Sequence, residues 1–258
     1  VAWTKQGASK EGHAHFMLKE IFDQKETLPA TLSLSKKELT RAVAMIKNSS
    51  KIFMTACGTA GHMCMGGEYF FIEKAGRAAP FVAASEFHKL APFIDKKSLL
   101  ITVTQSGETA DLLEAIKTAK ERGAKILSLV NARNSSVERE SDLVLPISVG
   151  VEKAVASTKA ASSQLALLVL LAYALSGEED AARRLLVRAA AGIRSWLSPA
   201  LLKKIEKTAG KFVTREHLYI IGKSLYFPVA LEAALKIKEV SYMHAEGLAS
   251  GELKHGTL

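Results

Sequence analysis

A bend in the stretch ITVTQSGETADLLEAI (101–116) gathers neutral hydrogen-bonding side chains between an apolar strand-like run and a helical pattern. Its donors are Thr104, Gln105, Ser106 and Thr109. Together with backbone N–H groups at the start of a helix, they can hold an anion without Lys or Arg, and Gly107 lets the backbone turn closely around a ligand. The stretch alone leaves two hypotheses open: a phosphate site, or a capped helix in a solvated loop.

No nucleotide signature accompanies this bend. No Gly-Lys-Ser/Thr follows it at the spacing of a P-loop, and no G-x-G-x-x-G follows a strand-like run in the chain. If an anion binds here, the sequence therefore favours a ligand other than a nucleoside triphosphate or a dinucleotide.

A second candidate for chemistry is the stretch LYFPVALEAALKIKEVSYM (225–243), which is apolar on nearly all sides and predicts a buried helix. Glu232, Lys236 and Glu239 nevertheless share one face, because spacings of four and seven residues return to the same side of a helix. They indicate either a surface Glu–Lys pair or a carboxylate and an amine that face a pocket and can transfer a proton. His255 follows between two glycine-containing turns, which makes it a further candidate for a chemical role.

Apolar runs alternate with helical patterns through the first two thirds of the chain, which predicts an α/β fold with a parallel sheet. The strand-like runs are residues 51–56, 79–83, 98–104, 125–131 and 142–148. The helical patterns are a polar entry followed by a short helix at 10–25, and helices at 35–48, 61–75, 109–122, 158–175, 178–195 and 198–213. Ser35 and Glu38 predict a capping box at the second of these helices. Because ligands of open parallel sheets bind beyond the carboxyl ends of the strands, the turns 57–60, 104–109 and 155–159 are the candidate binding segments.

The same pattern starts again at residue 217, where a strand-like run (217–223) precedes the helix 225–243. This weak duplication predicts two doubly wound units, the second of which stops after one strand and one helix. A parallel sheet cannot close on one strand, so we expect the second unit to be incomplete at its C-terminal end. We expect an N-terminal helical segment at residues 1–42 and a first unit at 43–181. A helical connector at 182–208 then leads to the start of a second unit at 209–258.

Composition argues against several functional classes. A chain of 258 residues with 48% hydrophobic content can bury a full core. The net charge of +9 is dispersed and has no interleaved aromatics, so we expect no nucleic-acid partner. The longest apolar block, 165–175, is too short to span a bilayer, and no signal peptide is visible, so we expect a cytoplasmic protein without a membrane partner. Cys57 and Cys64 fit neither a disulfide framework nor a zinc pattern, and we expect free thiols and no metal.

Six stretches together resemble the sugar-isomerase (SIS) domains, and among these the isomerase half of the glutamine–fructose-6-phosphate aminotransferases, or glucosamine-6-phosphate synthases. They are HFMLKEIFDQ (15–24), ACGTAG (56–61), ASEF (84–87), TQSGETAD (104–111), VASTKA (155–160) and LEAALKIKEVSYMHAEGLASGELKHG (231–256). They occur in order through almost the whole chain, and the last is long enough to be highly specific. The resemblance implies two SIS units, a substrate such as fructose 6-phosphate or glucosamine 6-phosphate, and no metal or redox cofactor.

The resemblance also implies roles for the residues at matching positions. The sugar phosphate would lie on Thr104, Gln105, Ser106, Thr109, Thr59 and Ala60. The sugar would be lined by Val155, Ala156 and Ser157 and by the backbone of Cys57 and Gly58. Glu239 would be the base that moves a proton between C1 and C2, and Lys236 would assist at the adjacent oxygens. His255 would open the hexose ring, reaching the site from the partner subunit of a homodimer.

Some positions depart from the family pattern. Ala60 and Thr104 stand where Ser is usual, and Thr257 stands where Pro is usual. The family also has a C-terminal tail with a Schiff-base lysine and a glutaminase domain fused upstream, and neither is visible in this sequence. We therefore expect the chain alone to be unable to use glutamine. Two alternatives remain open at this point: a stand-alone SIS-type glucosamine-6-phosphate deaminase, and a non-catalytic SIS domain that senses a sugar phosphate.

Overall fold

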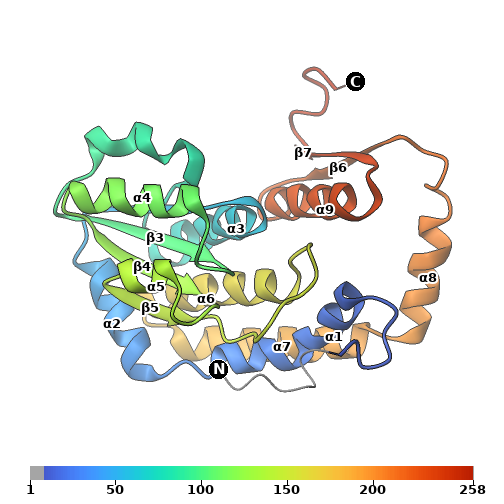
Figure 1. Ribbon diagram of the computed structural model, residues 1–258, viewed down its shortest axis with the longest axis horizontal. Helices are drawn as coiled ribbons and strands as arrows, with labels where there is room; N and C mark the ends of the chain where they lie inside the picture. Colours follow the sequence, from blue (N-terminus) through green and yellow to red (C-terminus); the bar gives the residue numbers. More distant parts are fainter. Residues whose placement is uncertain (1–8, 258) are drawn as a thin grey trace.

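A five-stranded parallel sheet forms the centre of the larger part of the molecule in the computed structural model, which describes residues 9–257 (Figure 1). The strand order is β2-β1-β3-β4-β5, and all four neighbouring pairs are parallel. The strands are β1 (Lys51–Ala56), β2 (Phe81–Ala83), β3 (Ser98–Thr104), β4 (Lys125–Val130) and β5 (Leu143–Pro146). Each of the five predicted strand-like runs contains one of these strands, so the prediction of a parallel α/β sheet is confirmed.

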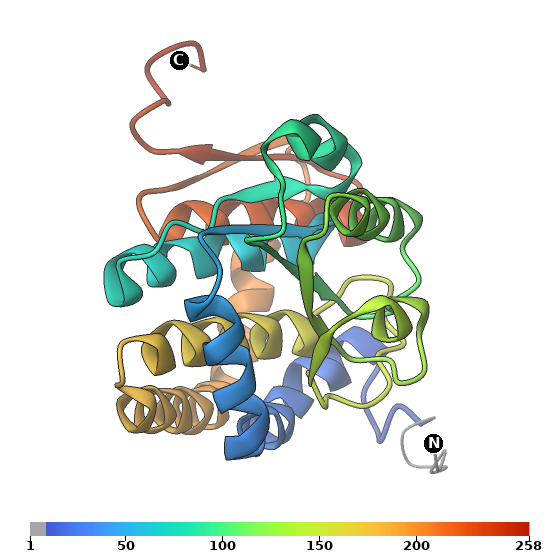
Figure 2. The same cartoon turned by 90° about the vertical axis from the view of Figure 1, so that its left-hand side faces the viewer.

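Both faces of this sheet are buried. The central strand β3 has no exposed residue, and its side chains alternate between two apolar clusters. Leu99 and Ile101 join the cluster with α3 and α6, whereas Leu100 joins the cluster with α4. This is the pattern of a parallel strand covered on both sides by helices. Figure 2 shows α6 and α7 as successive layers on one side of the strands and α4 on the other.

The helices that cover the sheet begin close to their predicted positions. They are α2 (Lys36–Lys47), α3 (Gly58–Ala75), α4 (Ala110–Glu121), α6 (Lys159–Leu175) and α7 (Glu179–Trp196). The capping box at the start of α2 is confirmed, since Ser35 Oγ accepts the Glu38 N–H and the Glu38 side chain accepts the Ser35 N–H. A short helix α5 (Ser136–Glu140) and a 3-10 helix (Ala84–Phe93) complete the layer around α4.

The N-terminal helix is longer than the sequence predicted. α1 (Phe16–Leu32) continues through Pro29 and packs against α6 and α7. Leu28 and Leu32 belong to the same apolar cluster as the sheet and α6. The N-terminal segment therefore shares the core of the sheet-containing part; the domain boundaries proposed from the sequence stay a prediction.

The chain continues through α8 (Pro199–Ala209) into a smaller unit made of β6 (His217–Gly222), α9 (Tyr226–Ser241) and β7 (His244–Ala249). The prediction that this unit holds a single strand was wrong, because residues 244–249 pair in parallel with β6 over six residues. Gly247 makes this possible: a Cβ there would lie 2.7 Å from the Leu231 Cα on α9. The alternation that usually marks a strand is absent from HAEGLA, so no local pattern predicts β7.

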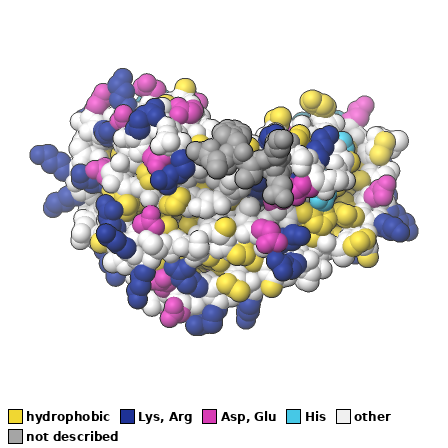
Figure 3. All heavy atoms as spheres, turned by 60° about the horizontal axis from the view of Figure 1, so that its bottom comes forward, with side chains coloured by type: hydrophobic (Ala, Val, Ile, Leu, Met, Phe, Trp, Pro, Cys, Tyr) yellow, Lys and Arg dark blue, Asp and Glu magenta, His cyan; other side chains and the backbone are white. Residues whose placement is uncertain are grey.

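Within the smaller unit, α9 packs against β6 and β7, and it also packs against α3 of the larger part (Figure 1). After β7 the chain extends away from the body in a series of turns. On the face shown in Figure 3, Lys and Arg side chains are interspersed with Asp and Glu. None of the helices within residues 9–257 is long and apolar enough to cross a membrane.

Candidate active site

A pocket of about 220 Å³ opens at the carboxyl ends of β1 and β3. In the order β2-β1-β3-β4-β5, the connection after β1 leads to β2 on one side, whereas the connection after β3 leads to β4 on the other side. Such a switch point leaves a crevice between the two outgoing connections, and open α/β sheets bind ligands there. The N-termini of α3 and α4 and the loop that precedes α6 all contribute to the wall. Aligned helix N-termini favour an anionic ligand.

Ten of the fourteen residues predicted for the site line this pocket. They are Cys57, Thr59, Ala60, Thr104, Gln105, Ser106, Thr109, Val155, Ser157 and Glu239. They come from three connections of the sheet and from α9, which are far apart in the sequence. The fold thus brings together residues that lie in separate stretches of the sequence.

The bend 104–109 keeps its hydroxyl protons available. Thr104 Oγ1 accepts the Gly107 N–H at 3.1 Å, and Ser106 Oγ accepts the Glu108 N–H at 3.2 Å. In both cases the hydroxyl is an acceptor in the bend, so its own proton is left for another partner. Thr109 is the N-cap residue of α4 without a side-chain cap bond. A helix does start here, but without a side-chain cap, and the residues of the bend line a pocket; the phosphate site itself stays a prediction.

Gly107 is required by the geometry of this bend. Its φ is +68°, and a Cβ at this position would lie 2.2 Å from Ser135 Oγ. The Gly107 carbonyl accepts the Val137 N–H, which ties the bend to α5. Glu108 turns its carboxylate away to accept the Ser136 N–H at 2.8 Å, and hydrogen bonds with the Ser136 side chain and then with its backbone hold the pKa of Glu108 below its ordinary value. The acidic residue of the bend is thus kept out of the pocket.

The turn between β1 and α3 supplies a thiol and a hydroxyl. Burial raises the pKa of the Cys57 thiol, and the nearby Asp111 carboxylate adds to this effect. Cys57 is therefore a neutral thiol at pH 7 rather than a nucleophile. The Thr59 hydroxyl donates to Glu232 Oε1 at 3.0 Å and accepts from Lys236 Nζ at 2.9 Å. Its proton is committed, so Thr59 can donate to a ligand only through its backbone N–H at the helix N-terminus.

Three charged residues of α9 face α3 and the pocket rather than solvent. Lys236 Nζ lies 2.7 Å from Glu239 Oε2 and 3.2 Å from Glu232 Oε1; the Lys236 and Glu232 side chains are largely buried, whereas Glu239 is partly exposed. With the bond to Thr59, the three ammonium protons of Lys236 each have an acceptor. Of the two hypotheses for this helix face, the structure supports the pocket-facing arrangement. Glu239 itself reaches the pocket wall.

His62 extends this set of charged residues and was not identified from the sequence. Its Nδ1 lies 2.8 Å from Glu232 Oε2, and the ring is about four-fifths buried. Because an ionised carboxylate only accepts, Nδ1 carries the proton in this bond. His62 lies on α3 and Glu232 on α9. Their contact joins residues far apart in the sequence, so no local sequence pattern indicates it.

Three further lining residues were also missed: Val103, Leu112 and Gln164. Gln164 is the informative one, because it is only 1% exposed and its Oε1 has no hydrogen-bond partner in the described part of the chain. Buried amide oxygens are normally paired, so a ligand hydroxyl would satisfy this one. In the sequence, Gln164 could have been noticed as a single amide side chain in the first turns of the very apolar helix α6.

Four predicted residues do not line the pocket. Gly58 and Ala156 adjoin residues that do, and Lys236 lies behind Glu239. His255 lies in the exposed turns after β7, where its N–H bonds the Glu252 carbonyl. This segment points away from the body of the molecule (Figure 1). Within one chain, His255 is therefore not brought to the pocket, and its arrival from a partner subunit stays a prediction.

Comparison with known proteins adds the family. Residues 45–174 match the SIS domain. The chain belongs to the SIS-domain family. The matched range contains β1 to β5 and the three pocket-lining connections, so the SIS match covers the sheet and the neutral side of the pocket.

Relatives of this SIS chain include isomerizing glutamine–fructose-6-phosphate aminotransferases. One from Symbiobacterium thermophilum is 40% identical and is matched over 100% of this chain and 45% of its own length. One from Aquifex aeolicus is 38% identical over 99% of this chain and 43% of its own. The chain thus spans less than half the length of the curated relatives it matches.

Solved structures with the same fold include two enzyme classes. The C-terminal domain of glucosamine-fructose-6-phosphate aminotransferase from Francisella tularensis superposes with a TM-score of 0.85 at 36% identity, covering 96% of this chain and 73% of that one. A glucosamine-6-phosphate deaminase from Thermotoga maritima superposes with a TM-score of 0.74 at 25% identity, covering 94% and 72%. Both likenesses extend over the SIS unit and the smaller unit that carries α9.

Proposed function

We propose that the pocket binds fructose 6-phosphate and that this chain is the isomerase part of an enzyme that makes glucosamine 6-phosphate from it and ammonia. The observation that carries the proposal is the position of Glu239, a carboxylate in the wall of a pocket whose other polar groups are neutral donors. A sugar phosphate needs both: donors for its phosphate, and one base for its carbons. The 36–40% identity to aminotransferases supports this over the deaminase at 25%.

The phosphate binds at the bend 104–109. Ser106 and Thr104 keep their hydroxyl protons free, and the N-terminus of α4 adds backbone N–H groups. Neutral donors hold a phosphate and also let it leave. Fixing the phosphate at one end places the other end of the sugar toward α9, so binding energy from a non-reacting group orients the reacting carbons.

The isomerisation is a proton transfer between C2 and C1. Interconverting a ketose and an aldose requires one positioned base that takes the proton from one carbon and returns it to the next. Glu239 has this role. Lys236, held at 2.7 Å from Glu239, moves protons at the neighbouring oxygens, and Gln164 Oε1 accepts from a sugar hydroxyl. Val155 and Ser157 line the pocket where the sugar would lie.

The whole protein is proposed to be a cytoplasmic homodimer with a glutaminase domain upstream of this chain. The relatives are more than twice as long as their match to this chain, which leaves room for that domain. Both cysteines are free within the described part of the chain, as in a reducing compartment. His255, in its exposed turn, would complete the site of the partner subunit by opening the hexose ring.

The test supplies the intact protein with fructose 6-phosphate and either glutamine or ammonia and measures glucosamine 6-phosphate. We expect product in both cases. Release of ammonia from glucosamine 6-phosphate, without synthesis from glutamine, would show the deaminase instead. Tight binding of the sugar phosphate without any turnover would show the non-catalytic sensor.

A further inference from the structure

The pocket wall at residues 155–157 has no helix or strand to hold it. It belongs to the segment between Pro146, where β5 ends, and Lys159, where α6 begins. The Val155 side chain is 96% exposed, so packing contributes little to its position. Something other than secondary structure must keep this wall in place.

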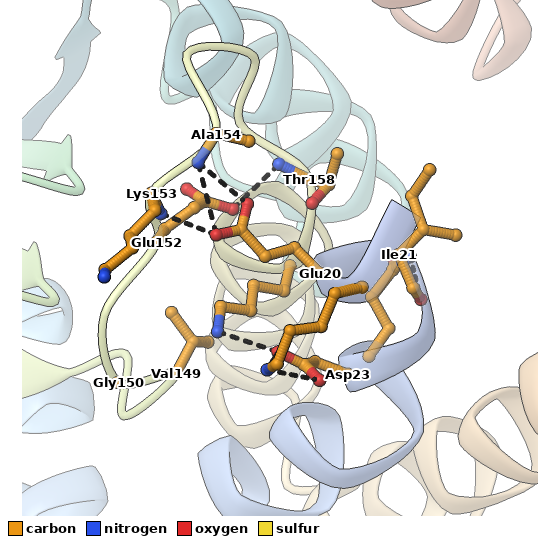
Figure 4. A network of polar contacts seen from close by, with 12 residues as sticks. Glu20, Ile21, Asp23, Val149, Gly150, Glu152, Lys153, Ala154 and Thr158 are labelled. Carbon is orange, nitrogen blue, oxygen red and sulfur yellow. Dashed lines mark hydrogen bonds and ion pairs between the residues drawn. The ribbon is translucent and has the colours of Figure 1, made fainter. Parts of the chain in front are cut away.

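A carboxylate from α1 holds the backbone next to this wall. Glu20 is 2% exposed, and its Oε1 accepts the N–H groups of Lys153 and Ala154, the second at 3.2 Å. Glu20 Oε2 also lies 3.2 Å from the Ala154 nitrogen. Figure 4 shows Glu20 reaching from α1 into the loop, with the two amides directed at its carboxylate. Ala154 directly precedes Val155, so the anchor lies one residue from the pocket wall.

A second carboxylate shapes the loop from within. Glu152 accepts the Thr158 N–H and the Ser157 hydroxyl, each at 2.8 Å, and the Ala160 N–H at 3.2 Å. It therefore caps α6 and orients Ser157, which lines the pocket. Hydrogen bonds to an ionised carboxylate are about twice as strong as neutral ones. The loop thus depends on two carboxylates that do not themselves line the pocket.

The helix that carries Glu20 is itself fixed against α6. Asp23 Oδ2 lies 2.9 Å from Lys19 Nζ and 3.1 Å from Lys159 Nζ, and both lysine side chains are buried (Figure 4). Burial alone would raise the pKa of Asp23, but hydrogen bonds and charge from the two lysines outweigh it and hold that pKa below its ordinary value. At neutral pH the three charges therefore connect α1 to the first residue of α6.

We propose that Glu20 is a positioning residue for the sugar end of the ligand: it fixes the Lys153–Ala154 backbone and thereby the wall at Val155–Ser157. This inference rests on the proposed function for the identity of the ligand. It makes binding at the sugar end depend on a residue that does not line the pocket. Glu20 lies on the N-terminal helix α1, outside the range that matches the SIS domain. The phosphate bend 104–109 has its own hydrogen bonds and does not depend on Glu20.

The experiment compares two ligands on one variant. Glu20→Gln keeps the side-chain volume but loses the charge and one acceptor oxygen. By calorimetry, its affinity for fructose 6-phosphate should fall about tenfold, as expected for losing a charge-assisted hydrogen bond. Its affinity for inorganic phosphate should stay within about twofold of the wild type, because phosphate alone does not reach the sugar wall. The matched control is Glu26→Gln, an exposed carboxylate on the same helix, which should change neither affinity.

Amide hydrogen exchange tests the anchor without any ligand. The amides of Lys153 and Ala154 should exchange about tenfold faster in Glu20→Gln than in Glu26→Gln. If Glu20→Gln does not fold, Glu20→Asp, which keeps the charge but is one methylene shorter, should show the same two effects at smaller size. Unchanged exchange, or an equal loss of affinity for both ligands, would overturn the positioning role. Failure of the wild type to bind fructose 6-phosphate would instead refute the proposed function, and the exchange measurement would still decide the role of Glu20.

Discussion

On the side formed by the bend 104–109, the pocket offers hydroxyls, an amide and backbone N–H groups, whereas on the α9 side it offers Glu239 with Lys236 behind it. The neutral side comes from the sheet and is built by contacts between nearby residues. The charged side comes from a helix more than a hundred residues later in the chain and is held by contacts with α3. In the proposed function, the neutral side binds the phosphate and the charged side reacts.

The division also explains why charges lie behind the pocket. Lys236 is saturated by Glu232, Glu239 and Thr59, so its charge is compensated before any ligand arrives. A free cation in the wall would bind the phosphate more tightly and slow its release. The two sides should therefore respond differently to substitution: changes on the neutral side should lower affinity, and changes on the charged side should lower turnover.

The largest effect on turnover should come from Glu239→Gln. Removing the base should lower kcat by about 10²–10⁴, since general bases contribute in that range, while the affinity for fructose 6-phosphate changes less than about threefold. Turnover assays on the intact protein and calorimetry on the same variant measure the two quantities. Full turnover in Glu239→Gln would remove this residue from the base role.

The largest effect on binding should come from Gly107→Ala. The φ of +68° and the close approach to Ser135 Oγ both disfavour a Cβ, so the bend must shift. We expect the free energy of unfolding to fall by roughly 1–3 kcal/mol and phosphate affinity to fall more than about tenfold. Gly150, which also has a positive φ but open space around it, provides the control: Gly150→Ala should leave phosphate affinity unchanged. Equal affinities in the two variants would contradict the role of the bend.

An intermediate effect, on turnover alone, is expected for His62→Phe. The ring keeps its approximate size but loses the hydrogen bond to Glu232, so Glu232 no longer holds Lys236 as firmly. We expect kcat to fall about tenfold, in line with one charge-assisted hydrogen bond, and the affinity for inorganic phosphate to stay the same. His62→Asn, which can still donate, should recover part of the activity. A change in phosphate affinity as large as the change in kcat would contradict the separation of the two sides.

The smallest effect, on the free energy of unfolding, should come from Asp23, a charged residue outside the pocket. The pKa of Asp23 is held below its ordinary value in the folded state, so its stabilisation is present above the unfolded pKa of about 4 and is lost as the pH falls through the folded pKa. Denaturant unfolding between pH 6 and about pH 3 should show this loss. The free energy of unfolding should fall by less than about 1 kcal/mol, because the carboxylate is partly solvated. Asp23→Asn should reduce the pH dependence, whereas the exposed Glu114→Gln should not.

Much of the sheet and the neutral side of the pocket could be predicted from sequence because both depend on local patterns. Apolar runs marked all five strands, and the donors of the bend 104–109 are contiguous. β7 could not be predicted, since it is held by pairing with β6 and by the close approach of Gly247 to α9. His62 and Glu20 were missed for a related reason: each acts through a contact with a residue more than a hundred positions away.

The most direct test of the division between the two sides is a paired measurement on Ser106→Ala/Thr109→Ala and on Glu239→Gln. For each protein, calorimetry gives the affinity for fructose 6-phosphate, and a saturated assay on the intact protein gives kcat. We expect the double variant to lose affinity about tenfold or more and to keep most of its kcat, while Glu239→Gln does the reverse. Unchanged sugar-phosphate affinity in Ser106→Ala/Thr109→Ala would contradict it.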